Sequence, residues 1–317
     1  MENENLSKIR KRNDFKSRVG WFLFILPVVL GILIFSLYPI VISLYYSFFK
    51  IYTGTTNLPQ WSVVEGFSNF GLFNYQKLFR DPEVWLSLRI TFTYSIIVVP
   101  SCLILSFFLA LLLNSKIKGV GVFRMIYYLP VIIPSTIWGL LWRDFFDTRF
   151  GLGNAIFTRL GLPSQTFFTS ASTALPTFMS IQLWTLGASM ILWLSALKNV
   201  PESLIEAAKL DGANGFLRLI YVIIPMCSSI LFYNIVTGII GAIQTLGPVM
   251  TLMGSSGAGP DNSLLFFAYK IYGTAFSSWQ MGYACALAWF MFVIIAALTG
   301  LIFKTSKWVY YGDGGNA

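Results

Sequence analysis

The feature of this sequence that most restricts its fold is a series of apolar runs of about 20 residues or more, whose centres carry no charged side chain. Only 11% of the residues are charged and 56% are hydrophobic, whereas soluble domains carry about 25% charged residues. A soluble protein with an unusually apolar core would still need charge on the outer faces of its helices, and these runs supply none. The chain is therefore predicted to be an all-α protein that crosses a membrane several times.

Six runs are long enough to span a bilayer. They lie at about 21–49, 90–114, 122–146, 173–197, 219–252 and 279–303. The first is far longer than the apolar part of a signal peptide and lacks a clear small-residue cleavage site, so we expect a retained helix, bent at Pro27 and Pro39. The apolar piece at 264–276 is too short to span comfortably. It is predicted to lie at the membrane surface or to re-enter the membrane.

The runs divide the chain into a basic N-terminal segment at 1–19, a transmembrane domain at 20–310 and a short tail at 311–317. The longest polar loop follows the first span, and short surface helices are predicted within it at 75–79 and 85–88. The sequence shows no internal repeat and no soluble domain of any size.

Basic residues decide the orientation of the predicted spans. Six spans place both termini on one side, and that side, with the loops at 115–124 and 198–218, carries 14 of the 22 lysines and arginines. Because loops rich in lysine and arginine remain in the cytoplasm, both termini and the 198–218 loop are predicted to be cytoplasmic. The net charge of +9 could suggest a nucleic-acid partner. Because the basic residues cluster at the ends of apolar runs, it indicates the lipid bilayer as partner instead.

Several kinds of chemistry are missing from the sequence. It has no histidine, and Cys102, Cys227 and Cys285 lie in or beside apolar runs without the spacing of a metal site. No phosphate-binding loop is present, and no nucleophile has a plausible base beside it. The span centres also lack the ionisable groups through which ion-coupled transporters work. We therefore predict neither an enzyme nor a bound cofactor or metal, and we expect the energy for any transport to enter from outside.

The stretch at 199–225 holds three acids within ten residues, between two apolar runs. It is predicted to form a short helix, a turn and a second short helix. Asn199 is expected to cap the first helix, Pro201 to stand in its first turn and Gly212 to end it. An ordinary interfacial helix and turn would account for this pattern.

A docking surface is the other interpretation of the same stretch. Ala207 and Ala208 would leave a flat face that another protein can approach closely, and Glu206 would pair with a cation on that protein. Ile224 and Pro225 would then lead the chain rigidly back into the bilayer. The residues alone leave both interpretations open.

The run EAAKLDGA, followed by IIP at 223–225, resembles the EAA signature of permease subunits of ABC importers. Further stretches, FRMIYYLPVIIPSTIWGLLWRDFFDTRFGLGNAI, GAGPDNS and AFSSWQMGYACALAW, resemble the binding-protein-dependent sugar permeases, and most of all their first-subunit type. The similarity covers about residues 20–310. It implies a type I ABC importer permease fold with six transmembrane helices and a cytoplasmic coupling helix between the fourth and fifth.

The resemblance also implies partners and roles. It implies a bacterial cytoplasmic-membrane protein that works with a second, non-identical permease subunit, two copies of a cytoplasmic ATPase that hold ATP and magnesium, and an extracytoplasmic solute-binding protein. Carried over by motif, the residues that would couple the chain to the ATPase are Glu206, Ala207, Ala208, Asp211, Gly212 and Ala213.

Sugar sites combine aromatic faces with amides and hydroxyls, and a few residues within the spans offer these groups. The candidates are Gln182, Trp184, Gly187, Asn234 and Gln244, with Trp184, Gly187 and Gln244 in regions that meet sugar in related permeases. Trp138, Trp142 and Trp193 are predicted to be packing or interfacial residues. The alternatives are an ABC permease for another solute, such as glycerol phosphate or a short oligosaccharide, and an ion-coupled transporter or channel. A phosphorylated solute would favour a cation near the site, and no span centre has one.

Overall fold

The computed structural model describes residues 23–50, 70–115, 118–254 and 257–310, and these ranges contain helices and connecting turns but no strand. The predicted N-terminal segment and C-terminal tail lie outside the described residues. Within the described ranges, three helices are long and apolar enough to cross a membrane, and three pairs of bent helices raise the number to as many as six if each pair is one span. The prediction of an all-α protein with six spans is confirmed in this form.

The chain divides into two compact units. The first comprises residues 1–78 and 274–289, and the second comprises residues 79–273 and 290–317. In the first unit a continuous helix runs from Leu23 to Ser47. It passes through Pro27 and Pro39, the two predicted bending positions, without a break. A π-helical turn at Leu33–Leu37 leads into α2 (Tyr38–Ser47), which has Pro39 in its first turn.

Side-chain hydrogen bonds hold the first unit together around α3 (Phe73–Arg80). Asn74 lies buried and donates from Nδ2 to the backbone oxygens of Ser47 at 2.9 Å and Phe49 at 2.8 Å. Lys77 donates to Gln280 Oε1 at 2.6 Å, just before α16 (Met281–Lys304). The predicted helix at 75–79 is thus confirmed as part of α3.

The second unit begins with α4 (Pro82–Leu113), a helix of 32 residues. Asp81 caps its N-terminus by accepting from Glu83 N at 3.0 Å, and it pairs with Lys270 Nζ at 3.3 Å. The span was predicted to start at residue 90, with a separate surface helix at 85–88. That prediction is wrong, because the cap and Pro82 start the helix eight residues earlier and 85–88 lies within it.

Three spans are broken by sharp bends. The pairs are α5 (Val120–Ile132) with α6 (Ser135–Phe145), bent by 99°; α8 (Ala171–Gln182) with α9 (Gly187–Lys198), bent by 43° across the 3₁₀ turn η3 (Leu183–Thr185); and the segment from Gly215 to Met226 with α13 (Ser228–Ile243), bent by 68°. These three bends were not part of the prediction. The predicted fifth span, 219–252, was also too long. The helix α13 ends at Ile243, and a separate helix, α14 (Gly247–Met253), packs against α6.

Prolines explain two of these bends. Ile133 precedes Pro134 and adopts an extended conformation with ψ 124°, as the residue before a proline prefers, so α5 ends there. Pro225 has no N–H to donate, and the turn before it is π-helical at Leu219–Ile223, with the Ile224 N–H bonded to Leu219 O. The chain then bends at Cys227. The predicted rigid continuation through Ile224 and Pro225 is therefore wrong.

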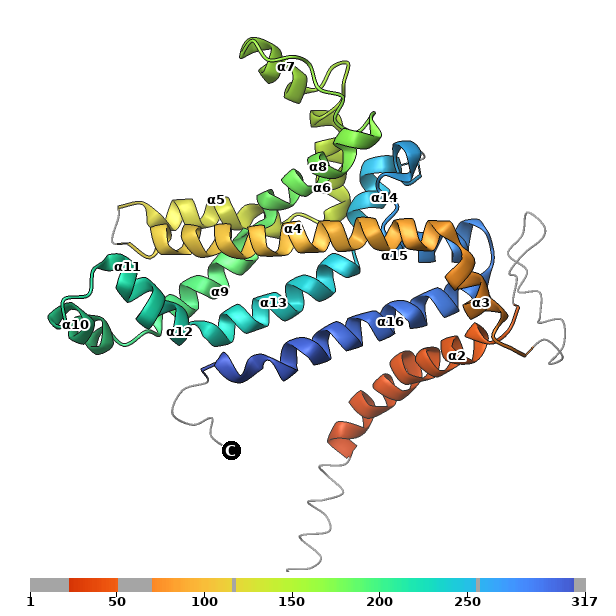
Figure 1. Cartoon of the computed structure of the whole chain (residues 1–317), viewed down its shortest axis with the longest axis horizontal. Coiled ribbons are helices and arrows are strands. Elements are labelled where there is room, and N and C mark those ends of the chain that lie inside the picture. The colour runs from red at the N-terminus through yellow and green to blue at the C-terminus, as the bar shows by residue number, and fades with distance from the viewer. Residues whose placement is uncertain (1–22, 51–69, 116–117, 255–256, 311–317) are drawn as a thin grey trace, which may run out of the picture. The chain divides into compact units, whose positions relative to one another are not determined.

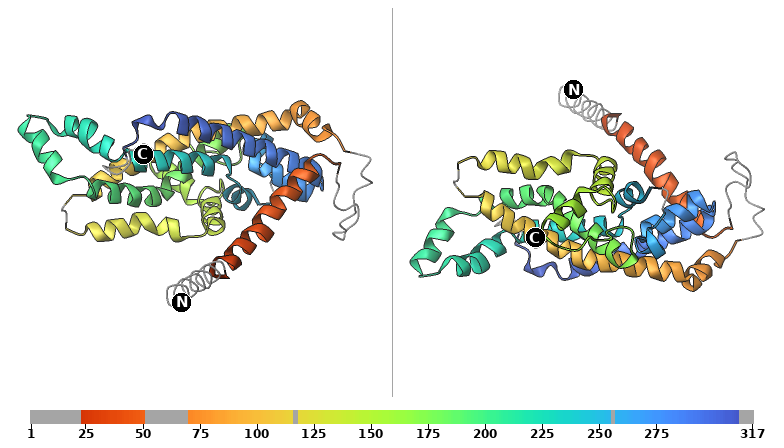
Figure 2. Two further views of the ribbon diagram at one scale, coloured as in Figure 1. Left: turned by 90° about the horizontal axis from the view of Figure 1, so that it is seen from below. Right: turned by 90° about the horizontal axis from the view of Figure 1, so that it is seen from above.

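The helices α4, α5, α9 and α13 of the second unit run side by side (Figures 1 and 2). Their core contains a cluster of three rings, Tyr94, Phe178 and Phe266, with centroids 5.0 to 5.5 Å apart. Phe266 is fully buried, and the next residue, Phe267, donates its N–H to Thr91 Oγ1 at 2.9 Å. The helix α15 (Phe267–Tyr272) thus packs on α4, and the choice between a surface and a re-entrant placement of 264–276 stays a prediction.

Gly187 supplies a test of this packing, because a Cβ built on it would lie 2.1 Å from the backbone oxygen of Tyr127 in α5. We expect Gly187→Ala to force α5 and α9 apart and to destabilise the protein by about 1–3 kcal/mol. Gly300→Ala in α16 is the control, since nothing lies within 4 Å of its Cβ position and alanine is the better helix former. Thermal unfolding in detergent should show a lower midpoint for Gly187→Ala only, and equal midpoints would contradict the described contact.

Candidate functional site

The 198–218 loop folds as two short helices joined by a turn, as predicted. The helix α10 (Glu202–Leu210) comes first and α11 (Gly215–Arg218) follows. Asn199 ends α9 and does not cap α10, whose N-cap is Pro201 and has no side-chain cap bond. The places of Asn199 and Pro201 therefore differ slightly from the prediction. In Figure 1, α10 and α11 project beyond the ends of α4 and α9.

The turn between the two helices is closed by backbone hydrogen bonds. Gly212 adopts φ +81°, a conformation that favours glycine. Its N–H donates to Lys209 O at 3.1 Å, and the Ala213 N–H donates to Ala208 O at 2.9 Å. These two bonds form the Schellman motif that ends many helices. Asn214 then caps α11 by accepting from Leu217 N at 2.9 Å.

The outer surface of this loop combines acidic, small and apolar groups. Glu206, Ala207, Asp211 and Gly212 are exposed, while Ala208 and Ala213 are half-buried. Leu210 is 90% exposed and Phe216 is 67% exposed. Two large apolar side chains are thus exposed in a loop that also carries charge.

The inner side of the loop rests on an apolar core. Val200 is buried and Ile205 packs against a cluster that contains Trp193, Phe107 and Cys227. The rings of Phe107 in α4 and Trp193 in α9 meet edge to face at 4.8 Å. The loop is therefore joined by close packing to α4, to α9 and to the break that precedes α13.

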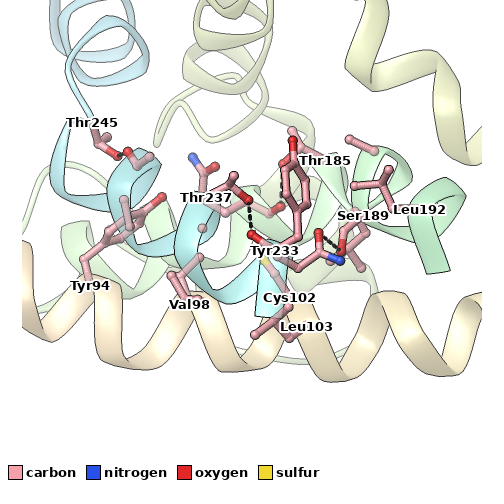
Figure 3. Close-up of a pocket in the computed structure, with 18 residues that line it drawn as sticks. Tyr94, Val98, Cys102, Leu103, Thr185, Ser189, Leu192, Tyr233, Thr237 and Thr245 are labelled. Carbon is pink, nitrogen blue, oxygen red and sulfur yellow. Dashed lines mark hydrogen bonds between the residues drawn. The ribbon is translucent and has the colours of Figure 1, made fainter. Parts of the chain in front are cut away.

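A cavity of about 430 Å³ lies deeper in the second unit, between α4, α9 and α13 (Figure 3). In Figure 3 the wall of the cavity carries a tyrosine and a hydroxyl residue toward each end. Tyr94 and Thr245 lie toward one end, and Tyr233 and Ser189 lie toward the other. Among the described residues, none that lines the cavity carries a charge. Its polar lining consists of hydroxyl and amide groups, which suit a neutral polar ligand.

Two amides in this cavity have donors without acceptors. Ser106 Oγ donates to Ser189 Oγ at 3.0 Å, and Ser189 Oγ donates to Asn234 Oδ1 at 3.2 Å, which joins α4, α9 and α13. Asn234 Nδ2 and Gln182 Nε2 are buried and have no hydrogen-bond partner within the described part of the chain. Buried donors are normally paired, so both nitrogens lack a hydrogen bond that such groups usually make.

The predicted substrate residues do not all meet. Gln182 and Asn234 line the cavity together. Trp184 lines a different cavity, Gly187 is buried where α5 approaches α9, and Gln244 is exposed at the end of α13. The structure thus places Gly187 in a close packing contact with Tyr127.

Sequence reasoning missed most of the polar lining, including Thr185, Ser189, Tyr233, Thr237 and Thr245. A signal was present in α13, where Asn234, Thr237 and Gly241 follow at i, i+3 and i+7 on one helical face. For Ser189 the sequence held no such signal, because its role depends on the partner residues from two other helices.

The described residues thus combine broken apolar spans, a projecting loop of two short helices and an uncharged cavity, an arrangement that fits a membrane transport subunit. No family model matches the chain. It is 34% identical over 308 residues to the probable ABC transporter permease protein YesP of Bacillus subtilis, with 95% of each chain covered. It is also 29% identical to the lactose transport system permease protein LacF of Rhizobium radiobacter, covering 91% of this chain and 94% of that protein. The chain therefore belongs to the permease subunits of ABC transporters, and it is not an enzyme.

Solved structures agree on the fold. A bacterial alginate ABC transporter, in complex with a periplasmic protein that holds an alginate pentasaccharide, contains a chain that superimposes with a TM-score of 0.74 at 19% identity. The match covers 93% of this chain and 96% of that one. The type I ABC importer permease fold expected from the sequence is thus confirmed.

The turn at Gly212 provides a local test. A β-branched residue is strained at φ +81°, so we expect Gly212→Val to fray the C-terminus of α10. Gly212→Asn is the matched control, because asparagine tolerates the left-handed region. Limited trypsin digestion of the purified protein should cut at Lys209 several-fold faster in Gly212→Val than in Gly212→Asn. Equal rates in both variants would contradict the assigned turn.

Proposed function

We propose that the chain forms half of the translocation pathway of an ATP-driven sugar importer, with its substrate in the cavity between α4, α9 and α13. The observation that carries the proposal is the uncharged cavity with the unpaired amide donors of Gln182 and Asn234. Sugar hydroxyls both donate and accept hydrogen bonds, so they would satisfy these amides and the neighbouring hydroxyls without a charged partner.

Relatives support this substrate class. Those matched by the chain include permeases named for lactose, for trehalose and maltose, and for arabinooligosaccharides. A phosphorylated solute such as glycerol phosphate would favour a cation in the cavity, and its described lining has none. Ion coupling is disfavoured by the same lining, because it offers no ionisable carboxylate or amine.

The assembly that we propose contains four kinds of chain. They are this permease, a second and non-identical permease, two copies of a cytoplasmic ATPase that hold ATP and magnesium, and an extracytoplasmic solute-binding protein. The alginate transporter supports a binding protein as partner, since its title names a periplasmic protein in the complex. We place the chain in the bacterial cytoplasmic membrane with both termini in the cytoplasm, a topology supported by the distribution of lysine and arginine.

In this proposal α10 docks in a groove of the ATPase. Glu206 pairs with a cation of the groove, Ala207 and Ala208 permit close approach, and Leu210 and Phe216 bury their exposed apolar surface. Movement of the groove is then passed through Val200 and Ile205 to the apolar core below. Because α9 and α13 leave that core and carry Ser189 and Asn234, the movement reaches the cavity wall.

The coupling assignment is tested by charge reversal. We expect Glu206→Lys to abolish ATP-driven sugar uptake by reconstituted vesicles, because it places a cation against the cation of the groove, while the protein still inserts in the membrane. Glu202→Lys in the first turn of the same helix is the matched control and should retain most of the uptake. Wild-type uptake by Glu206→Lys would contradict the assignment. Uptake that stops when ion gradients are collapsed, with ATP present, would contradict ATP drive.

Cys102 serves as a reporter for the cavity, since it lines the wall while Cys227 and Cys285 are buried. We expect N-ethylmaleimide to label Cys102 in the complete importer carrying Cys227→Ala and Cys285→Ala. A transported sugar should slow this labelling several-fold, and Asn234→Leu should remove the protection because leucine fills the space without the amide. Lactose, trehalose, maltose and arabinotriose form the first panel, with glycerol 3-phosphate as the control. Protection by glycerol 3-phosphate alone would contradict a sugar substrate.

A further inference from the structure

A group of three charged side chains lies at the N-terminus of α4. Lys270 of α15 places its Nζ 3.3 Å from Asp81 Oδ2, and it also donates to Glu83 Oε2. An ammonium group carries three N–H donors, so one lysine can hold both carboxylates. None of the three residues lines the inner cavity or belongs to the 198–218 loop.

The three side chains differ in how far water reaches them. Lys270 and Asp81 have side chains that are only 14% and 15% exposed, whereas that of Glu83 is 51% exposed. Asp81 is also fixed by its second role, since it caps α4 by accepting from Glu83 N. A lysine with so little exposure depends on its anionic partners, because an unpaired ammonium would lose its hydration without compensation. The three charges therefore fasten α15 to the first turn of α4.

Two further contacts join the same segment to α4 on the way to the inner cavity. The Phe267 N–H donates to Thr91 Oγ1 at 2.9 Å, and the rings of Phe266 and Tyr94 meet edge to face at 5.0 Å. With a rise of about 1.5 Å per residue, Glu83 and Tyr94 are about 16 Å apart along the helix. The segment 266–270 thus follows α4 from its N-terminus to the wall of the cavity.

The end of the cavity at Tyr94 is filled by rings. Tyr94 lines the cavity (Figure 3), and it packs against Phe178 and Phe266, both of which are fully buried. Phe266 directly precedes α15, so its position depends on the attachment of α15 to α4. The charged group at one end of 266–270 and the ring cluster at the other are therefore parts of one contact.

We propose that Lys270, Asp81 and Glu83 form an ionic latch that keeps the Tyr94 end of the inner cavity closed. Lys270 is a positioning residue in this proposal, since it acts through Phe266 and does not touch the solute. The inference rests on the proposed transport function and its topology, in which the N-terminus of α4 lies on the extracytoplasmic side. The latch would then control entry to the cavity from that side. Release is feasible because water already reaches Glu83 and can hydrate its carboxylate when Lys270 leaves.

The test measures how fast a reagent reaches the cavity from outside. Cys102 lines the cavity eight residues beyond Tyr94 in α4, and it is kept as the only cysteine by Cys227→Ala and Cys285→Ala. The complete importer is placed in right-side-out membrane vesicles without binding protein, sugar or ATP. A sulfonated maleimide, which does not cross the membrane, is then added outside.

We expect Lys270→Met to raise the rate of Cys102 labelling several-fold, because 266–270 is no longer held to the first turn of α4. Lys270→Arg should label at nearly the parent rate, since a guanidinium can also hold both carboxylates. Lys304→Met is the matched control, because it removes an exposed lysine from the last turn of α16. It should leave the rate unchanged.

An exchange of charges tests the pairing itself. Lys270→Glu alone should label Cys102 fast, and Lys270→Glu combined with Glu83→Lys should restore slow labelling, because the pair is again of opposite sign. A second chain that keeps only Cys227, in the core under the 198–218 loop, reports on loosening of the whole fold. N-ethylmaleimide, which crosses membranes, should label that chain equally slowly with and without Lys270→Met.

Three results would overturn the latch. They are an unchanged rate at Cys102 in Lys270→Met, an equal increase at Cys102 and at Cys227, and fast labelling that persists after the exchange of charges. The labelling requires no sugar, so it is separate from the test of the proposed function. A parent importer that takes up no sugar would contradict sugar import, and the labelling rates would still decide whether the latch closes the cavity.

Discussion

Backbone hydrogen bonding in a medium without water is the constraint on which this structure depends. In hydrocarbon an unpaired N–H or C=O costs several kcal/mol, so an irregular backbone is tolerated only where protein or a cavity surrounds it. Cys227 illustrates the solution. It is fully buried, its N–H donates to Ile223 O at 3.0 Å, and its own oxygen accepts from Ile230 N and Leu231 N.

Two of the three broken spans lie beside the sites proposed for function. The η3 turn borders both cavities, and the break at Cys227 lies in the core under the 198–218 loop. A straight helix presents residues at fixed intervals, whereas a break turns neighbouring side chains to different sides. Gln182 and Trp184 line different cavities, and residues two positions apart face different sides of a helical turn in any case. The third break, at Pro134, allows α6 to turn away from α5 and pack against α14.

Composition and patterning predicted the fold class, the number of spans and the short helices of the 198–218 loop. Charge-free runs and the glycine at 212 were sufficient for these, because both act through local physics. The helix breaks were beyond the sequence. Pro27, Pro39 and Pro100 leave their helices continuous, while Pro134 coincides with a bend of 99°. The local sequence does not separate these prolines, so the positions of the breaks could not be predicted from it.

Some residues of the candidate site could be predicted from the sequence, and others could not. Asn234 and Gln182 were found as amides within apolar runs, where a polar group always requires a partner. Ser189 and Thr185 were missed, because serine and threonine commonly bond back to their own helix and give no signal. Trp184 was predicted beside Asn234 and Gln182, but it lines a different cavity. Gly187 was chosen beside it, and only the approach of Tyr127 shows that its small size is needed for packing.

A transport site must bind its substrate and also release it, and the lining of the inner cavity suits that requirement. Each buried donor left unpaired costs about 1–3 kcal/mol, so a sugar that satisfies Asn234 and Gln182 gains affinity from relieving that cost. Charged groups would add a stronger attraction that opposes release. With neutral groups alone, a small displacement of α9 relative to α13 separates Ser189 from Asn234 and disrupts the wall. Since both helices leave the apolar core under Val200 and Ile205, the proposed coupling through the loop would need only a modest movement.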